Sequence, residues 1–242
     1  MSSATSLHEH QAGEPTIEIH EVDLAAVSVR ELNAGLHAAE PGSRWTVSQP
    51  AGRHNVAVGI DRPLEVTVGG HVGYYCAGMH QRGTVEVHGN AGVGLAENIM
   101  SGRVHVTGDA SQSAAATGNG GLVVIDGNTG ARCGISMKGV DIVVGGNVGH
   151  MSAFMAQAGR LVVCGDAGEA LGDSIYEARI YVRGQVASLG ADCVEKPMGP
   201  SHLAELTELL RAAGRPDDPT TFRRYGSART LYHFHADHAS AY

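Results

Sequence analysis

Seven glycines recur at a constant spacing of 19 residues between Leu64 and Val194, and this spacing constrains the fold more than any other feature. Apolar residues stand two and four positions before each glycine, so every copy contains a short alternating strand with one inward face. We call these residues the anchor glycines: Gly70, Gly89, Gly108, Gly127, Gly146, Gly165 and Gly184. Fixed periods of this size are typical of repeat architectures, in which each unit packs against the next.

The repeat predicts one coil of a solenoid per copy. Its 19 residues are too few for two helices, and no copy shows a helical apolar pattern. The sequence therefore predicts an all-β fold, a right-handed parallel β-helix of seven coils, in which like strands stack into parallel sheets. We expect each anchor glycine to adopt a positive φ at a corner, and the polar residue after it to make local side-chain bonds.

A column of small residues lies seven positions after the anchor glycines. A position that is small in every coil predicts a narrow interior in which two sheets approach each other closely. The column consists of Ala77, Ala96, Ala115, Gly134, Ala153, Gly172 and Ala191.

The flanking segments lack the repeat and predict a division of the chain into four parts. Residues 1–14 are polar and expected to be disordered, 15–63 form an N-terminal α/β cap, 64–194 the β-helix, and 195–242 a C-terminal helix with an aromatic docking tail. Within the cap we expect a strand over 16–23 and one or two strands between Trp45 and Val58. Ser28 precedes Glu31 by three residues, a capping-box spacing that predicts a helix to about Ala39.

The C-terminal part predicts a helix from Pro200 to Gly214, with Leu203, Leu206, Leu209 and Leu210 on one face, and a linker over 215–219. The tail from Phe222 to His235 carries four of the eleven Phe, Trp and Tyr residues of an aromatic-poor chain. It is expected to dock either on its own solenoid or on a partner, and the sequence favours neither.

Composition excludes several classes of function. The formal net charge of −8 argues against a nucleic-acid-binding protein that relies on phosphate contacts. No long apolar run predicts a membrane span, and the N-terminus lacks a signal-peptide pattern. Cys76 and Cys133 share a column but lie three coils apart, roughly 14 Å by strand spacing, which is beyond disulfide reach. Cys164 and Cys193 occupy different columns, so we expect reduced thiols in a cytoplasmic protein.

Candidate chemistry in the chain is weak. His88 with Glu86, or His105 with Asp109, could form acid–base pairs, but no column offers a third, orienting group. The glycines of 89–94 do not fit a phosphate-binding loop, and His233, His235 and His238 lack further convergent metal ligands. The sequence therefore predicts no catalytic, cofactor-binding or metal-binding residue.

A set of apolar and basic residues in the fourth and fifth coils forms either a contact face or part of the core. Methionine is adaptable in both settings, so the two interpretations stay open. The set is Arg132, Met137, Lys138, Met151, Phe154 and Met155.

Four segments resemble the GXGXG-repeat β-helix family, which includes the C-terminal domain of the glutamate synthase large subunit. The likeness is greatest to the stand-alone small β-helix subunit of N-methylglutamate synthase and of glutamate-synthase-like complexes. The bare repeat is moderately specific, and the last of the four segments is absent from generic solenoids. The segments are 71–79, 133–146, 149–157 and 224–234.

The resemblance implies a structural subunit of a cytoplasmic hetero-oligomer acting in methylamine metabolism. A glutamine-amidotransferase-like subunit and an FMN-binding, iron–sulfur synthase subunit would be its partners and would hold the cofactors. One alternative is a scaffold like the β-helix component of formylmethanofuran dehydrogenase, which we expect to lack residues 224–234. Another is an independent β-helix enzyme acting on polysaccharide, which would need clustered carboxylates and basic residues on one sheet face, and the columns predict none.

Overall fold

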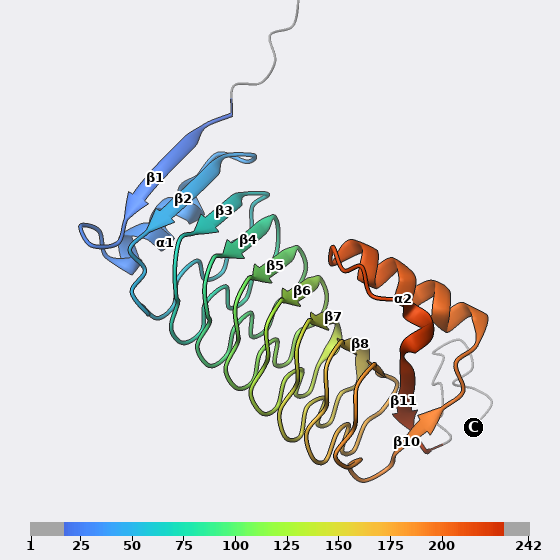
Figure 1. The fold of residues 1–242 in the computed structure, drawn as a ribbon. Coiled ribbons are helices and arrows are strands. Elements are labelled where there is room, and N and C mark those ends of the chain that lie inside the picture. The colour runs from blue at the N-terminus through green and yellow to red at the C-terminus, as the bar shows by residue number, and fades with distance from the viewer. Residues whose placement is uncertain (1–16, 230–242) are drawn as a thin grey trace, which may run out of the picture.

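The computed structural model describes residues 17–229 and forms a stack of coils (Figure 1). Eleven strands make one sheet, in the order β1 to β9, then β11, then β10. The strands are β1 (Ile19–Asp23), β2 (Arg44–Ser48), β3 (Glu65–Val68), β4 (Thr84–Val87), β5 (Arg103–Val106), β6 (Leu122–Ile125), β7 (Lys138–Val144), β8 (Ala158–Val163), β9 (Arg179–Val182), β10 (Cys193–Lys196) and β11 (Arg223–Ser227). The predicted all-β parallel β-helix is confirmed, whereas the predictions for residues 1–14 and for the chain beyond Arg229 lie outside the described residues.

Strands β3 to β9 pair in parallel with residues 19 apart, so equivalent side chains stack in columns. Val66 pairs with Val85, Val85 with Val104, and Val104 with Val123. All four side chains are at most 1% exposed, because this column faces the interior of the rod. The sequence period therefore sets both the strand register and the core.

The wall opposite the sheet is not a second sheet, which corrects the expectation of two approaching sheets. It consists of turns in which φ is positive at every second residue, as at Tyr75, Ala77 and Met79. Tyr75 donates its N–H to the Val93 carbonyl of the next coil, and Ala77 donates to the Val56 carbonyl of the preceding coil. These bonds join the coils as a strand ladder would. We call the residues four to eleven positions after each anchor glycine the turn wall.

The interior between the sheet and the turn wall is narrow, as predicted. A Cβ atom added to Gly134 on the turn wall would lie 3.0 Å from Cδ1 of Ile142 on β7. Side chains larger than alanine in this column would therefore collide with the opposite sheet.

The anchor glycines are required by crowding between coils and not by a positive φ, which corrects the sequence-based explanation. Of the seven, Gly70 alone has a positive φ. A Cβ atom on Gly146 would lie 2.5 Å from Oδ1 of Asn128 and 2.9 Å from the carbonyl oxygen of Gly127. The backbones of successive coils thus come too close for any side chain at this corner.

The polar residues after the anchor glycines form bonds between coils, where local bonds were expected. Oδ1 of Asn128 accepts the N–H of Asn147 at 2.9 Å, and Oδ1 of Asn147 accepts the N–H of Asp166 at 2.7 Å. Asp109 and Asp166 continue this ladder in the same way. The ladder occupies the space that the missing glycine side chains leave.

Helix α1 (Val29–Ala38) closes the N-terminal end of the interior. The predicted capping box is present, since Ser28 Oγ accepts the N–H of Glu31 and the Glu31 carboxylate accepts the N–H of Ser28. Leu32 and Leu36 on its inner face are 1% exposed. Helix α1 also contacts Trp45, because a Cβ on Gly35 would lie 3.0 Å from that ring.

A further coil precedes the seven with anchor glycines, inside the segment assigned to the cap. Strand β2 is the one strand formed between positions 44 and 58, and it pairs in parallel with β3. The turns after it repeat the positive φ values of the turn wall, at Asn55, Ala57 and Gly59. Asn55 donates its N–H to the Tyr74 carbonyl of the next coil, so this segment belongs to the same ladder.

Helix α2 (Pro200–Ala212) covers the outer face of strands β6 to β9. Its Leu206, Leu209 and Leu210 are buried against the sheet, while Leu203 is half-buried. The outward column beneath it changes character along the rod. Its residues are Thr67, Glu86 and His105 on the open part, and Val124, Val143, Val162 and Tyr181 on the covered part.

The predicted linker after α2 is fixed to the rod by ion pairs. The Asp217 carboxylate lies 2.5 Å from Nη1 of Arg183 and 2.9 Å from Nε of Arg215, and its side chain is 5% exposed. Phe222 then packs with α2, and β11 pairs antiparallel with β9. The described part of the aromatic segment therefore docks on its own solenoid.

Candidate functional site

An ionic cluster joins α2 to the outer face of the sheet. Asp141, Arg160 and Arg179 lie in one outward column of strands β7 to β9, with 19 residues between each. Nε of Arg160 donates to Oδ1 of Asp141 at 2.6 Å. From α2, the Glu205 carboxylate accepts hydrogen bonds from Arg179 and from the Tyr181 hydroxyl, both at 2.5 Å. Nη1 of Arg160 lies 3.4 Å from Glu205, so the cluster is continuous.

Burial and pairing shift the pKa values of this cluster. The hydrogen bonds that Arg160 donates to the Asp141 carboxylate raise the pKa of Arg160. Burial, together with the Glu205 carboxylate, raises the pKa of Tyr181. Burial and the nearby guanidinium groups of Arg224 and Arg179 lower the pKa of His202. At neutral pH Arg160 is therefore charged and Tyr181 is a neutral donor.

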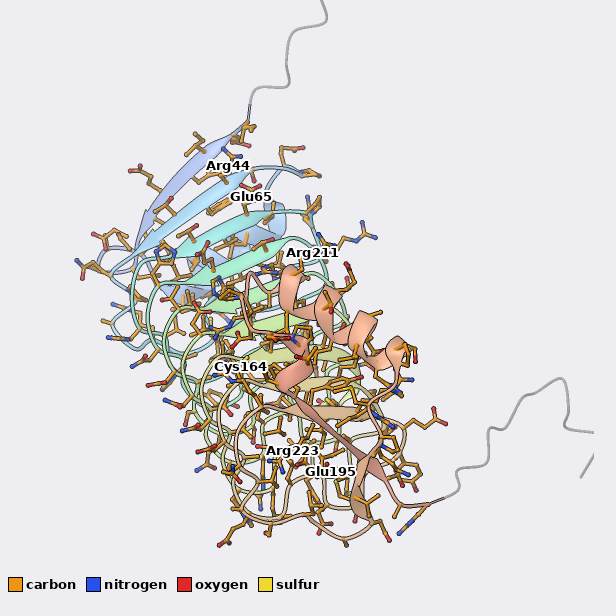
Figure 2. All side chains as sticks on the ribbon, turned by 45° about the vertical axis from the view of Figure 1, so that its right-hand side comes forward. Arg44, Glu65, Cys164, Glu195, Arg211 and Arg223 are labelled. Atoms are coloured by element: carbon orange, nitrogen blue, oxygen red, sulfur yellow. The ribbon has the colours of Figure 1, made fainter. Side chains whose placement is uncertain are left out.

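A cleft of about 500 Å³ opens between this cluster and the sheet. Asp141, Arg160, Glu177, Arg179 and Glu205 line it, so acidic and basic side chains do gather on one sheet face, contrary to the sequence-based expectation. The charges of the paired residues neutralise one another; these are Asp141, Arg160, Arg179 and Glu205. A charged substrate would have to break these pairs, so the cluster acts chemically as a clamp for α2. Figure 2 shows α2 lying over the outer face of the sheet.

The histidines of the two acid–base pairs that the sequence suggested, His88 and His105, lie on the part of the sheet that α2 leaves uncovered. His88 Nε2 lies 3.0 Å from the Glu86 carboxylate, as considered. His105 does not pair with Asp109; its Nε2 lies 3.0 Å from Asp126, and its Nδ1 lies 3.8 Å from Glu86. These contacts form a row of alternating acidic and histidine side chains on the rod surface. No serine, threonine or cysteine side chain takes part in the contacts of this row that involve described residues.

The cysteines are buried and, within residues 17–229, free of disulfides, as predicted. Burial raises the pKa of the Cys76 and Cys133 thiols to about 12, and that of Cys164 and Cys193 to about 11. A thiol reacts as its thiolate, so these side chains are poor nucleophiles at neutral pH.

Two further findings hold for the described part of the chain. Among residues 17–229, no group of three or more His, Cys, Asp or Glu side chains could hold a metal ion, and the tail histidines lie outside this range. No helix within that part is long and apolar enough to cross a membrane.

Exposed apolar side chains gather on the turn wall. Tyr74 and Met79 in one coil, and Val93 and Met100 in the next, are each between 42% and 50% exposed. Met155 and Tyr176 form a second exposed pair nearer the C-terminal end.

The six residues considered as a contact face divide between surface and core. Met137 is fully buried and fills the interior, whereas Arg132, Lys138 and Met155 are exposed. Met151 and Phe154 are half-buried. Met137 is therefore part of the core, whereas Arg132, Lys138 and Met155 are available on the surface for contacts.

Sequence reasoning missed the ionic cluster and the cover over the sheet. Two signals were available in the outward columns. Asp141 and Arg160 carry opposite charges at 19-residue spacing, which places them side by side on neighbouring strands. The apolar run Val124, Val143 and Val162 on an outer face also predicts a covering element.

Comparison with known proteins identifies one relative of high similarity. No protein-family model matches the chain. The chain is 64% identical over 225 residues to "Protein GlxC" of Rhizobium meliloti (strain 1021), a match that covers 91% of this chain and 99% of that protein. The match is long enough to include the coils, α2 and the ionic cluster together.

Proposed function

The chain belongs to the GlxC family, and on that premise we propose that it is a non-catalytic structural subunit of a glutamate-synthase-like complex. Two features support this proposal. The repeat and the segment 224–234 resemble the β-helix subunits of such complexes. The rod also offers stacked, rigid coils whose buried thiols are unreactive and whose main ionic cluster is used to hold α2.

The proposed partners are a glutamine-amidotransferase-like subunit and an FMN-binding synthase subunit that also carries an iron–sulfur cluster. N-methylglutamate synthase is the specific complex we favour, located in the cytoplasm. In this proposal the rod bridges the two partners and binds no cofactor itself. The release of ammonia and the synthase reaction would take place on the partner subunits.

The observation that carries the proposal is the exposed apolar surface on the turn wall. Four large apolar side chains in two successive coils face solvent in the isolated chain, and exposed apolar patches commonly mark protein–protein contacts. Inter-coil hydrogen bonds fix the backbone beneath them, so little conformational entropy is lost when a partner binds.

Purification from the source cell under native conditions tests the proposal. We expect a tagged chain to recover one amidotransferase-like and one flavin-containing protein in constant ratio. Recovery of the tagged chain alone, with neither partner, would overturn the proposal.

A matched pair of variants tests the role of the turn wall. Met100→Asp places a charge in the apolar patch, whereas Gln157→Asp places one at the equivalent position of another coil, where the exposed side chain is already polar. We expect Met100→Asp to reduce partner recovery at least tenfold without changing the unfolding temperature, and Gln157→Asp to change neither. Equal recovery with both variants would exclude this patch as the contact.

A further inference from the structure

The sheet has an open edge at the N-terminal end of the rod. Strand β1 is the first strand in the sheet order and, among the described residues, pairs with β2 alone. Figure 1 shows β1 as the outermost strand of the stack. Helix α1 closes the interior at this end, where its Leu32 and Leu36 are buried, but it adds no strand beside β1. The backbone of β1 therefore has one side without a neighbouring strand.

The hydrogen-bond register shows which backbone groups of β1 point outward. The Glu18 carbonyl accepts the N–H of Arg44 on β2 at 2.8 Å. In a parallel pair every second residue bonds to the neighbouring strand, so Ile19 and Glu21 direct their backbone groups away from β2. Neither the N–H nor the carbonyl of these two residues has a partner within residues 17–229. The outer edge thus offers donors and acceptors to a further strand.

Strand β1 lacks most of the features that protect natural edge strands from pairing, which include lysine, proline and β-bulges. All five of its residues pair with β2 in one unbroken register, so there is no bulge, and its sequence contains neither lysine nor proline. Ile19 is 67% exposed, the highest fraction of any large apolar side chain in the described chain, and Ile17 is 45% exposed. An edge of this kind is suited to binding an extended segment as an added strand.

Acidic side chains at this edge determine which strand fits it. Residues 17–23 include Glu18, Glu21 and Asp23 and no lysine or arginine. A second copy of this chain would bring three more carboxylates to the same edge, and like charges on adjacent strands destabilise their pairing. A basic strand would instead meet opposite charges. The edge therefore disfavours a second copy and favours a basic segment of another protein.

The alternation of the β1 side chains sets the pattern of the added strand. Glu21 and Asp23 are exposed on the outer face, whereas Val22 packs partly buried against the core. Successive residues of a strand point to opposite faces of the sheet. An added strand would therefore place basic residues beside Glu21 and Asp23, and apolar residues beside Val22.

We propose that the outer edge of β1 binds an extended segment of a partner protein in which basic and apolar side chains alternate. The segment adds a strand to the sheet through the backbone groups of Ile19 and Glu21, and its basic side chains pair with Glu21 and Asp23. A rod that bridges two proteins needs two contact surfaces, and the apolar patch of the turn wall is one of them. The need for a second surface rests on the proposed function, whereas the edge itself is tested on this chain alone.

Binding of a short peptide to the full chain tests this proposal. The probe alternates lysine and valine over about eight residues, slightly more than the length of β1. One control peptide has glutamate in place of lysine, and the other has the same composition with all lysines before all valines. We expect the probe to bind at least tenfold more tightly than either control. Hydrogen exchange should become slower at the Ile19 and Glu21 amides, while the His20 and Val22 amides, which point to β2, should change little.

Two variants examine the backbone and the charge separately. Ile19→Pro removes an outward N–H but keeps every carboxylate, and proline is tolerated at the first residue of an edge strand. Glu21→Lys reverses a charge and keeps the backbone. We expect each to weaken binding of the probe at least tenfold without changing the unfolding temperature. Glu40→Lys, an exposed charge reversal that follows α1, is the control and should leave binding unchanged.

Several results would overturn the proposal. Equal binding of the probe and of the peptide with separated lysines would show a general attraction between charges. Undiminished binding to both β1 variants would place the contact elsewhere. Binding that occurs only after removal of residues 1–16 would make the N-terminus of the chain itself the occupant, and a dimer that Ile19→Pro dissociates would make it a second copy. The purification described above measures which proteins are recovered, so either proposal can fail while the other stands.

Discussion

A methyl group added at Gly146 would lie 2.5 Å from Oδ1 of Asn128, well inside van der Waals contact. Gly146→Ala should therefore lower the free energy of unfolding by about 2 kcal/mol, as overpacking typically does. Gly69→Ala is the matched control at the residue before an anchor glycine, because the nearest atom to its added methyl group, the Val47 carbonyl oxygen, would be 3.6 Å away. Urea denaturation of both variants measures the difference. Equal stabilities would show that the coils can move apart to accept the methyl group.

His80 provides a second prediction for a single side chain. It is fully buried, and burial lowers its pKa below the ordinary value of 6.5. The unfolded chain therefore binds a proton more readily than the folded chain, so the contribution of His80 to stability is complete above about pH 6.5 and is lost as the pH falls below it.

The variant His80→Leu should remove this part of the pH dependence. Its stability should be lower by about 1 kcal/mol at pH 8, because the His80 ring lies 3.1 Å from the Gly83 carbonyl and this hydrogen bond is lost. Between pH 7 and pH 5 the variant should lose less stability than the natural chain. Parallel slopes for the two proteins in chemical denaturation over this range would contradict the prediction.

At the scale of elements, Glu205 is the residue that attaches α2 to the sheet. Glu205→Ala leaves Arg179 and the buried Tyr181 hydroxyl without their acceptor, and it should lower the free energy of unfolding by about 1–2 kcal/mol. Glu208→Ala is the control, since its pair with Arg211 is largely exposed and should contribute little to stability. If the two variants unfold alike in urea, the ionic cluster does not hold the helix.

The elements differ in how far the sequence predicts them, and the differences have physical causes. Strands such as β4 follow from inward valines at a constant period, because each coil pairs only with its neighbours. The turn wall could not be predicted in the same way. Tyr75 and Met79 adopt positive φ values that their side chains disfavour, and bonds to adjacent coils offset the strain.

The ionic cluster was missed because it combines distant parts of the sequence. Asp141 and Arg160 are neighbours through the repeat, but Glu205 reaches them only after the chain has turned back over the sheet. No periodic signal connects α2 to the strands. The apolar outward column shows that a cover is needed without showing which segment supplies it.

At the scale of the whole molecule, a stack of coils transmits disturbances mainly to neighbouring coils. Leu36→Ala creates a cavity under α1, where Leu36 is 1% exposed, and should destabilise the N-terminal coils by about 3 kcal/mol. Amide exchange should become faster in β3 and β4 and stay unchanged in β8. Leu209→Ala on α2 is the reciprocal control and should affect exchange in β6 to β8. A uniform increase along the rod in either variant would show a fully cooperative molecule.

Helix α2 runs back along the rod, opposite to the order in which the chain adds its coils. The helix has 13 residues and is therefore about 20 Å long. It runs back from β9, where Glu205 meets Arg179, to β5, where Arg103 donates to the Ala212 carbonyl. Seven residues of helix, or about 10 Å, separate these two contacts, and the long arginine side chains span the rest of the four strand spacings of about 19 Å. One coil and one helical turn advance by nearly the same distance, so a longer or shorter rod of this kind keeps its cover only if coils and helical turns are gained or lost together.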